Sequence, residues 1–333
     1  MSAADRARGA LYGLAIGDAL GMPTQLLSRE QITARWGPLL TGFEPAPPGH
    51  PIAAGLPPGA VTDDTEQAVL LARMLVKDQG VPSAGDWAAA LIAWDLDMAE
   101  RCSLDLLGPS TTRALTAILD GTPPGEAGSH GDTNGAAMRI TPVGIAFPAT
   151  ASGLSSLVDH VVEASLVTHN TSVALAGAAA VAAAVSAGIG GASVADATET
   201  GIAAARLGAE RGHWIAGADV AARIGWAADL VRDADPDQAA GLIGTLVGTS
   251  LATQESVPAA FAVLAAVPND PWRACLLAAS LGGDTDTIAA MAGAIAGACH
   301  GQSAFPPHAI ATIDAHGFNL PALAVSLLAL RES

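Results

Sequence analysis

Two short acidic clusters, far apart in the chain, carry the side chains best suited to chemistry. The first is Thr62-Asp63-Asp64-Thr65, and the second is Asp284-Thr285-Asp286-Thr287, which follows two glycines. Each cluster places two carboxylates and two hydroxyls in four consecutive residues, and such carboxylates repel each other unless a cation lies among them. Mg²⁺, Mn²⁺ and Ca²⁺ prefer oxygen ligands of this kind. The clusters together offer four carboxylates, whose charge two divalent ions would balance.

Helix capping is the simpler explanation of either cluster taken alone, because each one lies where a helix-like apolar run begins. Asp and Thr are common N-cap residues, Asp63 and Glu66 have the spacing of a capping box, and an acidic first turn is favourable to the helix dipole. However, one oxygen is enough to cap a helix. The second Asp and the flanking Thr, present in both clusters, therefore favour a cation site.

The clusters must be positioned by helices, because helical periodicity extends over most of the chain. Hydrophobic residues make up 50% of the sequence, with many alanines, and aromatic residues only 4%. Small side chains let helices pack closely and have little β preference. The longer predicted helices cover residues 4–20, 65–76, 87–100, 155–167, 170–187, 193–209, 217–232, 236–250, 256–265, 271–281 and 285–299. We expect an all-α protein and, since no repeat or linker divides the chain, one domain over residues 1–333.

The first predicted helix carries a glycine at every fourth position, namely residues 9, 13, 17 and 21. This spacing places the glycines on one face, where another helix can approach at backbone distance. Gly293 and Gly297 repeat the pattern after the second acidic cluster. Asp18 lies beside the first glycine stripe, so we expect it in the interior, where a carboxylate needs a cation or several donors. It is a candidate group behind a metal site.

Charge and cysteine content limit the partners and the compartment. The formal net charge is -17 and Lys77 is the only lysine, which argues against binding to a nucleic-acid backbone or to an anionic membrane surface. The apolar run over residues 173–192 is long enough to span a bilayer, but its Ala/Gly-rich composition favours a buried helix. The three scattered cysteines lack metal-ligand spacing and predict reduced thiols in a cytoplasmic protein.

Three irregular stretches could serve a site or could be purely structural. Residues 37–59 contain seven prolines and lead directly to Thr62, and loops of that length are often lids or binding loops, although a disordered surface loop explains them equally. Residues 121–135 form a glycine-rich approach to a helix, which leaves backbone N–H groups for an anion or simply makes a turn and cap. His169, at a junction between two predicted helices, would ordinarily be a cap or a packed polar residue.

Five motifs follow one another along the chain, at residues 17–23, 62–65, 134–139, 168–169 and 282–287. They occur in the same order in ADP-ribosylglycohydrolases, and the sequence resembles that family from about residue 5 to residue 315. The resemblance implies a compact, orthogonal bundle of many helices. It also implies a cleft with two Mg²⁺ or Mn²⁺ ions, and hydrolysis of the bond to the anomeric carbon of an ADP-ribosyl group.

The same resemblance implies roles for individual residues. The metal ligands would be Thr62, Asp63, Asp64, Asp284, Asp286 and Thr287. The ribose and pyrophosphate cleft would be lined by Asn134, Gly135 and Met138, with His169 near the nucleotide. The catalytic residues would be Asp63, Asp64 and Asp105, the last of which falls where some members place a carboxylate that helps to open the ribose ring.

One position departs from the family pattern. Many members carry Glu two residues after the Pro of the first motif, whereas this sequence has Gln25. An amide can orient a ligand but cannot take up a proton. Either another acid, Asp105 or a metal-held Asp, supplies the base, or the substrate is not a classical ADP-ribosylated protein.

Three further readings stay open at this point. The substrate could be a smaller nucleoside or ribosyl metabolite, or the protein could bind ADP-ribose without turning it over. The run from Asp284 to Thr287 also fits the DxDx[TV] pattern of aspartyl-phosphate phosphatases, in which the first Asp is a nucleophile. That pattern requires a buried strand before it and an α/β core, and helices surround it here.

Overall fold

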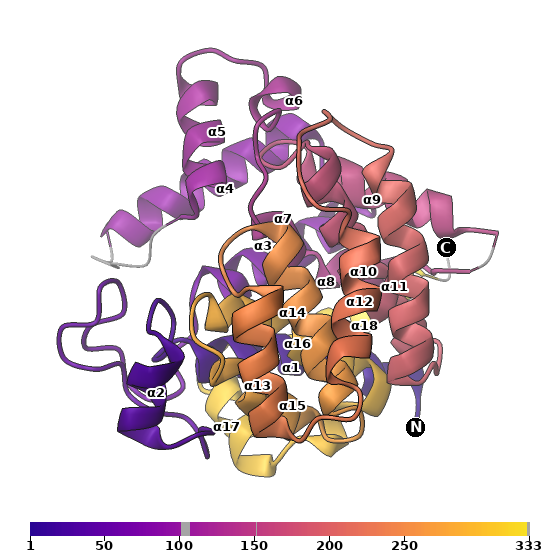
Figure 1. Ribbon diagram of the computed structural model, residues 1–333. Helices are drawn as coiled ribbons and strands as arrows, with labels where there is room; N and C mark the ends of the chain where they lie inside the picture. Colours follow the sequence, from indigo (N-terminus) through magenta and orange to yellow (C-terminus); the bar gives the residue numbers. More distant parts are fainter. Residues whose placement is uncertain (101–106, 151, 332–333) are drawn as a thin grey trace.

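The fold is organised around two long helices, α1 (Ala3–Gly21) and α16 (Thr285–His300), which lie antiparallel at the centre of the molecule (Figure 1). The computed structural model describes residues 1–100, 107–150 and 152–331. The α10 helix (Ser172–Ile189) and the α14 helix (Thr253–Ala266) also pack against α16. The central pair therefore lies inside a shell of further helices.

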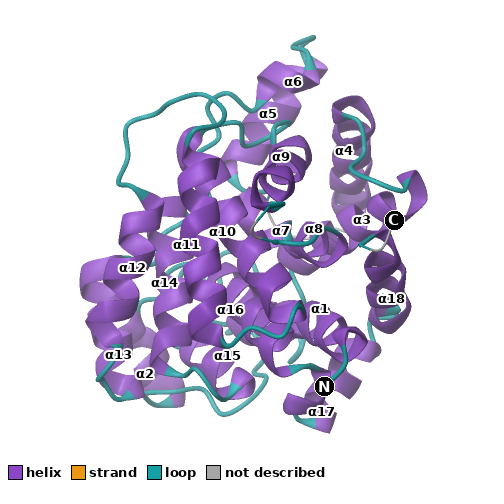
Figure 2. Ribbon diagram, turned by 90° about the vertical axis from the view of Figure 1, so that its right-hand side faces the viewer, coloured by secondary structure: helices purple, strands orange, loops and turns teal. Residues whose placement is uncertain are grey.

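Helices joined by loops account for the rest of the architecture (Figure 2). Over residues 1–100, 107–150 and 152–331 there is no β-strand, and only two isolated bridges occur, Thr133 with Ala252 and Thr171 with His213. The all-α prediction is therefore confirmed. The other helical elements are α2 (Arg29–Trp36), α3 (Asp63–Asp78), α4 (Ala84–Glu100), α5 (Pro109–Leu119), α6 (Pro124–Ala127), α7 (Gly135–Arg139), α8 (Thr141–Ala146), α9 (Leu154–Ser165), α11 (Val194–Ala209), α12 (Val220–Val231), α13 (Pro236–Leu242), the π-helix η1 (Ile243–Val247), α15 (Pro271–Ala279), the 3₁₀ helix η2 (Gln302–Ala304), α17 (Pro307–Asp314) and α18 (Leu320–Leu330).

One predicted helix, over residues 236–250, changes type along its length and ends three residues earlier than predicted. The α-helix ends at Leu242 and continues as a single π turn, η1, to Val247. Gly248 then takes φ +91°, a left-handed conformation that ends a helix and that glycine adopts without steric cost. The chain from Gly248 to Ala252 runs on as a loop, which brings Leu251 to the cavity described below.

The glycine stripe of α1 lies directly against the backbone of α16, as its spacing predicts. A Cβ atom built on Gly9 would lie 2.2 Å from the carbonyl oxygen of Gly297, and one built on Gly13 would lie 2.0 Å from that of Gly293. At the end of α1, a Cβ on Gly21 would lie 2.4 Å from the backbone nitrogen of Asp286. The stripe therefore fixes the position of the second acidic cluster.

Replacing Gly13 by Ala is expected to lower the free energy of unfolding by about 3 kcal/mol, the upper range for overpacking a close contact. The added methyl group would meet the backbone of Gly293, which cannot rotate away. Gly241→Ala in α13 is the matched control, since a Cβ there meets nothing within 4 Å and should be neutral or slightly stabilising. Urea unfolding of both variants measures the difference, and equal stabilities would contradict the close packing.

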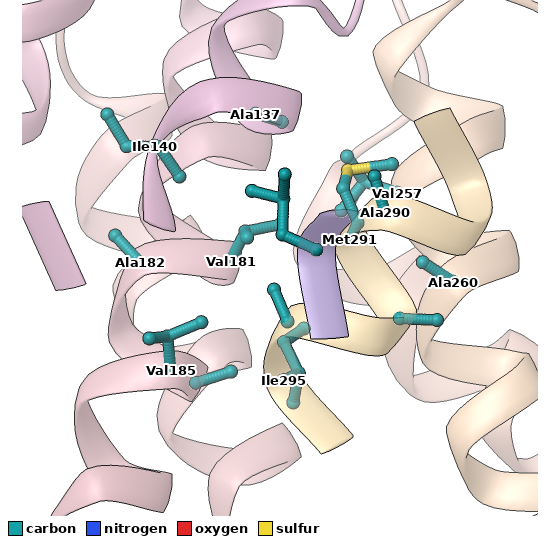
Figure 3. Packing of buried hydrophobic residues seen from close by; sticks show 14 of the residues in the cluster. Ala137, Ile140, Val181, Ala182, Val185, Val257, Ala260, Ala290, Met291 and Ile295 are labelled. Carbon is teal, nitrogen blue, oxygen red and sulfur yellow. The ribbon is translucent and has the colours of Figure 1, made fainter. Parts of the chain in front are cut away.

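The α10 helix forms the apolar centre beside this pair. Figure 3 shows Val181 and Val185 of α10 lying toward Met291 and Ile295 of α16. By length and composition α10 could cross a membrane, and 94% of it is buried inside the protein. The prediction of a buried helix at this position is therefore confirmed.

Candidate functional site

The two acidic clusters meet at the starts of α3 and α16. The hydroxyl of Thr287 donates to Oδ2 of Asp64 over 3.3 Å, which joins the clusters directly across 223 residues of sequence. Both clusters face one cavity of about 270 Å³. The residues that line it are Gln25, Leu26, Ile52, Asp63, Asp64, Leu107, Gly108, Pro109, Thr111, Thr133, Asn134, Gly135, Met138, Leu251, Asp284, Asp286 and Thr287. The predicted meeting of the two clusters is confirmed.

Helix capping explains little of this arrangement. In the first cluster only Thr62 caps, by accepting a hydrogen bond from the backbone N–H of Asp64. In the second cluster Asp284 is the N-cap residue of α16, but its side chain makes no cap hydrogen bond. The other three carboxylates, Asp63, Asp64 and Asp286, belong to the first turns of their helices and line the cavity. Capping therefore does not explain why four carboxylates gather at this cavity.

Asp18 holds the first cluster in place from behind. Its carboxylate accepts hydrogen bonds from the backbone N–H groups of Thr62 and Thr65, at 3.0 and 3.1 Å, and from both of their hydroxyls. Burial raises the pKa of Asp18 to about 6, although these hydrogen bonds oppose the shift. Asp18 is fully buried, as predicted, and its partners are protein donors.

Thr62 differs in placement from the other five predicted metal ligands. Its hydroxyl lies 2.8 Å from Asp18, and Thr62 is not among the residues that line the cavity. Asp63, Asp64, Asp284, Asp286 and Thr287 all line it. The structure therefore gives Thr62 a place at the helix cap, one layer behind the cavity wall.

The second cluster is positioned by the turn that precedes it. Gly282 and Gly283 have φ of +85° and +79°, and a Cβ on Gly283 would lie 2.3 Å from the carbonyl oxygen of Thr249. The backbone N–H of Asp284 donates to that same oxygen at 2.7 Å, and the N–H of Leu26 donates to the carbonyl of Gly283. Glycine is required here by both conformation and space. The turn also ties the second cluster to Leu26 in the cavity wall.

The carboxylates in this cavity are electrostatically strained. Burial raises the pKa of Asp64 well above its usual range, and the charges of Asp286, Asp63, Asp18 and Asp284 raise it further. Burial also raises the pKa of Asp284 to about 6, against the hydrogen bonds from Asn134 and Thr287. Within the described residues, the buried Oδ1 atom of Asp64 accepts no hydrogen bond. Buried carboxylates of this kind need a cation or further donors.

The donor set fits hard divalent cations, because it consists of carboxylate and hydroxyl oxygens around one cavity. In the described part of the chain, however, no three His, Cys, Asp or Glu side chains are close enough together to hold a metal ion as they stand. The fit therefore depends on the chemistry of the donors and on their shared cavity. It does not depend on a preformed coordination sphere.

A second part of the cavity wall comes from the start of α7. Asn134, Gly135 and Met138 line the cavity, as predicted, and the amide of Asn134 donates to Oδ2 of Asp284 and to Ser256. His169 does not line the cavity. It is completely buried behind Thr133, whose hydroxyl lies 3.0 Å from Nε2 of the imidazole.

Thr133 is therefore a cavity residue that the motif comparison missed. It directly precedes Asn134 in the sequence, and a hydroxyl at that position was the available signal. Because His169 does not line the cavity and Thr133 does, the imidazole can act on a ligand through the hydroxyl of Thr133.

A further part of the cavity wall is formed by Gln25, Leu26, Ile52 and Leu251. The loop between α2 and α3 contributes Ile52 and is fastened by His50, whose Nε2 lies 2.9 Å from the carbonyl oxygen of Gln25. Nδ1 of His50 accepts the N–H of Ala53, so the loop is ordered at this point and takes part in the cavity wall. The predicted catalytic residue Asp105 lies outside the described residues, and Leu107 and Gly108 that follow it line the cavity.

Comparison with known proteins yields consistent matches. The sequence model of one family, described as ADP-ribosylglycohydrolase, matches residues 1–333. An uncharacterized protein of Escherichia coli (strain K12), YegU, is 38% identical over 312 residues, which are 93% of this chain and 92% of that protein. The ADP-ribosylarginine hydrolase Tri1 of Pseudomonas putida (strain GB-1) is 32% identical over 315 residues, 92% of this chain and 73% of that protein.

A solved structure supports the fold. The chain described as an ADP-ribosylglycohydrolase-related protein complex superposes with a TM-score of 0.70 and 24% sequence identity, over 99% of both chains. At this identity the likeness concerns the arrangement of helices. It confirms the predicted fold type.

Proposed function

Since this chain belongs to the ADP-ribosylglycohydrolase family and is a hydrolase of that type, we propose that it cleaves the bond at the anomeric carbon of an ADP-ribosyl group with the help of two divalent cations. The observation that carries this proposal is the shared cavity: four carboxylates from two distant turns face the same space as Asn134 and Gly135. Neither turn alone would suffice.

The proposed ligands of the two ions are Asp63, Asp64, Asp284, Asp286 and Thr287, all of which line the cavity. Thr62 stays a predicted ligand, and in the structure its hydroxyl faces Asp18. Mg²⁺ or Mn²⁺, when bound, would bind ribose hydroxyls and lower the pKa of a water molecule. The protein itself supplies the positions: Asp18 holds the first turn, and Asn134 holds Asp284 by a direct hydrogen bond.

The attacking water must lose a proton to a carboxylate, since the amide of Gln25 cannot accept one. We assign this role to Asp64, with Asp63 beside it, because both carboxylates line the cavity next to the other proposed ligands. Asp105 stays a prediction as a second acid. Gln25 lines the cavity and can orient a ribose hydroxyl or the leaving group through its amide.

The proposal also concerns the group that is released from the anomeric carbon. The Pseudomonas putida relative is described as an ADP-ribosylarginine hydrolase, so an ADP-ribosyl group on arginine is the first candidate substrate. A smaller nucleoside or ribosyl metabolite is the second candidate, because about 270 Å³ lies just below the usual range of about 300–1,000 Å³ for small-molecule sites.

A substrate panel with and without a chelator tests the proposal. We expect release of free ADP-ribose from ADP-ribosyl-arginine or ADP-ribosyl-serine, measured by chromatography, with loss of product in EDTA and recovery on adding Mn²⁺. Release of base from nucleosides alone would favour the smaller substrate. Calorimetric binding of ADP-ribose without product over hours would contradict hydrolysis and indicate a binding protein.

A further inference from the structure

A buried arginine, Arg139, does not line the cavity, but it donates hydrogen bonds to two residues that in turn contact Asp63 and His169. Arg139 ends α7 and is 1% exposed. Its Nη1 donates to Oε1 of Gln67 at 2.8 Å, and its Nη2 donates to the hydroxyl of Thr168 at 2.6 Å. The guanidinium also lies over the ring of Trp87, with Cζ 5.5 Å from the ring centroid. The proposed function assigns no role to this group.

On the metal side, the guanidinium fixes the direction of the hydrogen bonds through Gln67. Because a guanidinium only donates, the oxygen of the Gln67 amide must face Arg139. The amide nitrogen of Gln67 therefore faces Asp63, and it donates to Oδ2 of that carboxylate at 2.9 Å. Asp63 is held as an acceptor, with its side chain kept against the cavity wall.

On the other side, the same argument fixes the tautomer of His169. The hydroxyl of Thr168 accepts from Arg139, and its own hydrogen then needs an acceptor, because buried donors are rarely left unpaired. In the described residues only Nδ1 of His169, at 2.7 Å, offers one. Nδ1 is thus the acceptor, and the proton of the imidazole lies on Nε2.

This tautomer determines what Thr133 presents to the cavity. Nε2–H of His169 donates to the hydroxyl oxygen of Thr133 over 3.0 Å. Burial lowers the pKa of His169 well below its usual range, and the charges of Arg139 and Arg113 lower it further, so the imidazole is neutral. The hydroxyl hydrogen of Thr133 is left to donate to a ligand in the cavity, which Thr133 lines.

We propose that Arg139 is a positioning residue that sets the direction of hydrogen bonding at two cavity residues, Asp63 and Thr133. It does so by holding Asp63 as an acceptor and His169, the partner of Thr133, as the Nε2–H tautomer. The metal half of this inference depends on the proposed function. The tautomer half does not, because it concerns only the protein.

Arg331 provides a matched control for loss of a buried arginine. Its guanidinium is also largely covered and donates to the backbone carbonyl oxygens of Gly144, Ile145 and Ser186. Arg331 does not line the cavity. Arg331→Met should therefore lower thermal stability and leave the site as it is.

The test combines Mn²⁺ titration calorimetry on metal-free protein with ¹⁵N NMR of histidine-labelled protein, in which the signal of His169 is assigned with His169→Gln. In the wild type we expect the Nε2–H tautomer. Arg139→Met should weaken Mn²⁺ binding by about 10- to 100-fold, the usual effect of removing a group that orients a ligand. In the same variant, the ¹⁵N signals of His169 should no longer be those of the Nε2–H tautomer alone.

Two milder variants separate the effect on Mn²⁺ binding from the effect on the His169 tautomer, and they test the inference even if Arg139→Met does not fold. Gln67→Leu should weaken Mn²⁺ binding and leave the tautomer unchanged, whereas Thr168→Val should change the tautomer and leave Mn²⁺ affinity unchanged. If Gln67→Leu and Thr168→Val both behave like Arg331→Met, Arg139 only fills space and the inference is overturned. If the wild-type protein does not bind Mn²⁺, the proposed function and the role of Arg139 at Asp63 are both refuted. The NMR measurement of the His169 tautomer would still test the role of Arg139 at His169.

Discussion

Asp64→Asn is expected to reduce the rate of ADP-ribose release by at least about 10³-fold with the fold retained. Asp64 accepts a hydrogen bond from Thr287 of the second cluster, and its other oxygen is buried without a hydrogen-bond partner among the described residues. An amide keeps the shape but removes the charge that would balance a cation. Several kcal/mol of charge stabilisation depend on that cation, and each 1.4 kcal/mol corresponds to a factor of ten in rate.

The metal-free Asp64→Asn variant should be at least as stable as the wild type. Burial and the neighbouring carboxylates disfavour the charged form of Asp64, so the amide relieves a cost at neutral pH. Asp78→Asn, at the exposed end of the same helix, is the matched control and should keep full activity. Wild-type turnover by Asp64→Asn in Mg²⁺ would refute the mechanism, and circular dichroism would exclude unfolding as the cause of lost activity.

Removal of divalent cations is expected to abolish turnover and to lower Tm by roughly 10 °C. Each ion at a hundredfold excess over its Kd adds about 2.7 kcal/mol to the free energy of unfolding. A change of 1 kcal/mol shifts Tm by about 2 °C in a chain of this size. The physical reason is that the ions neutralise carboxylates that repel each other in the metal-free cavity. Differential scanning calorimetry in EDTA and in excess Mn²⁺ measures the shift.

The same calorimetry can show whether the two clusters form one site. Asp286→Asn should remove most of the stabilisation by Mn²⁺, although Asp286 lies 222 positions after Asp64 in the sequence. If the clusters act together, the Asp64→Asn/Asp286→Asn double variant should lose little more than either single variant, since residues in one network are not additive. Independent, additive losses would mean that each turn binds its ion alone.

The sequence predicts the parts of this site that are fixed by local pattern. The redundancy of Asp and Thr at two helix starts points to Asp63, Asp64, Asp284 and Asp286, which share one cavity. The fourfold glycine spacing predicts the close contact of α1 with α16. Both features depend on residues that are near each other in the chain, so periodicity and composition are enough to find them.

The rest depends on side-chain directions that only the folded chain determines. His169 is predicted near the nucleotide, and in the structure it does not line the cavity but contacts Thr133, which does. Thr62 belongs to the acidic motif, and its hydroxyl faces Asp18 instead. The role inferred for Arg139 could not be predicted from the sequence, although Arg139 belongs to one of the motifs. It depends on hydrogen bonds to Gln67 and Thr168, which are far from Arg139 in the chain.

The most direct test of the central claim is the anomalous diffraction of crystals grown with Mn²⁺. The account predicts two anomalous peaks in the cavity, between the Asp63–Asp64 turn and the Asp284–Thr287 turn, and their loss in crystals of Asp64→Asn. Crystals of active enzyme in saturating Mn²⁺ with no anomalous peak in that cavity would contradict it.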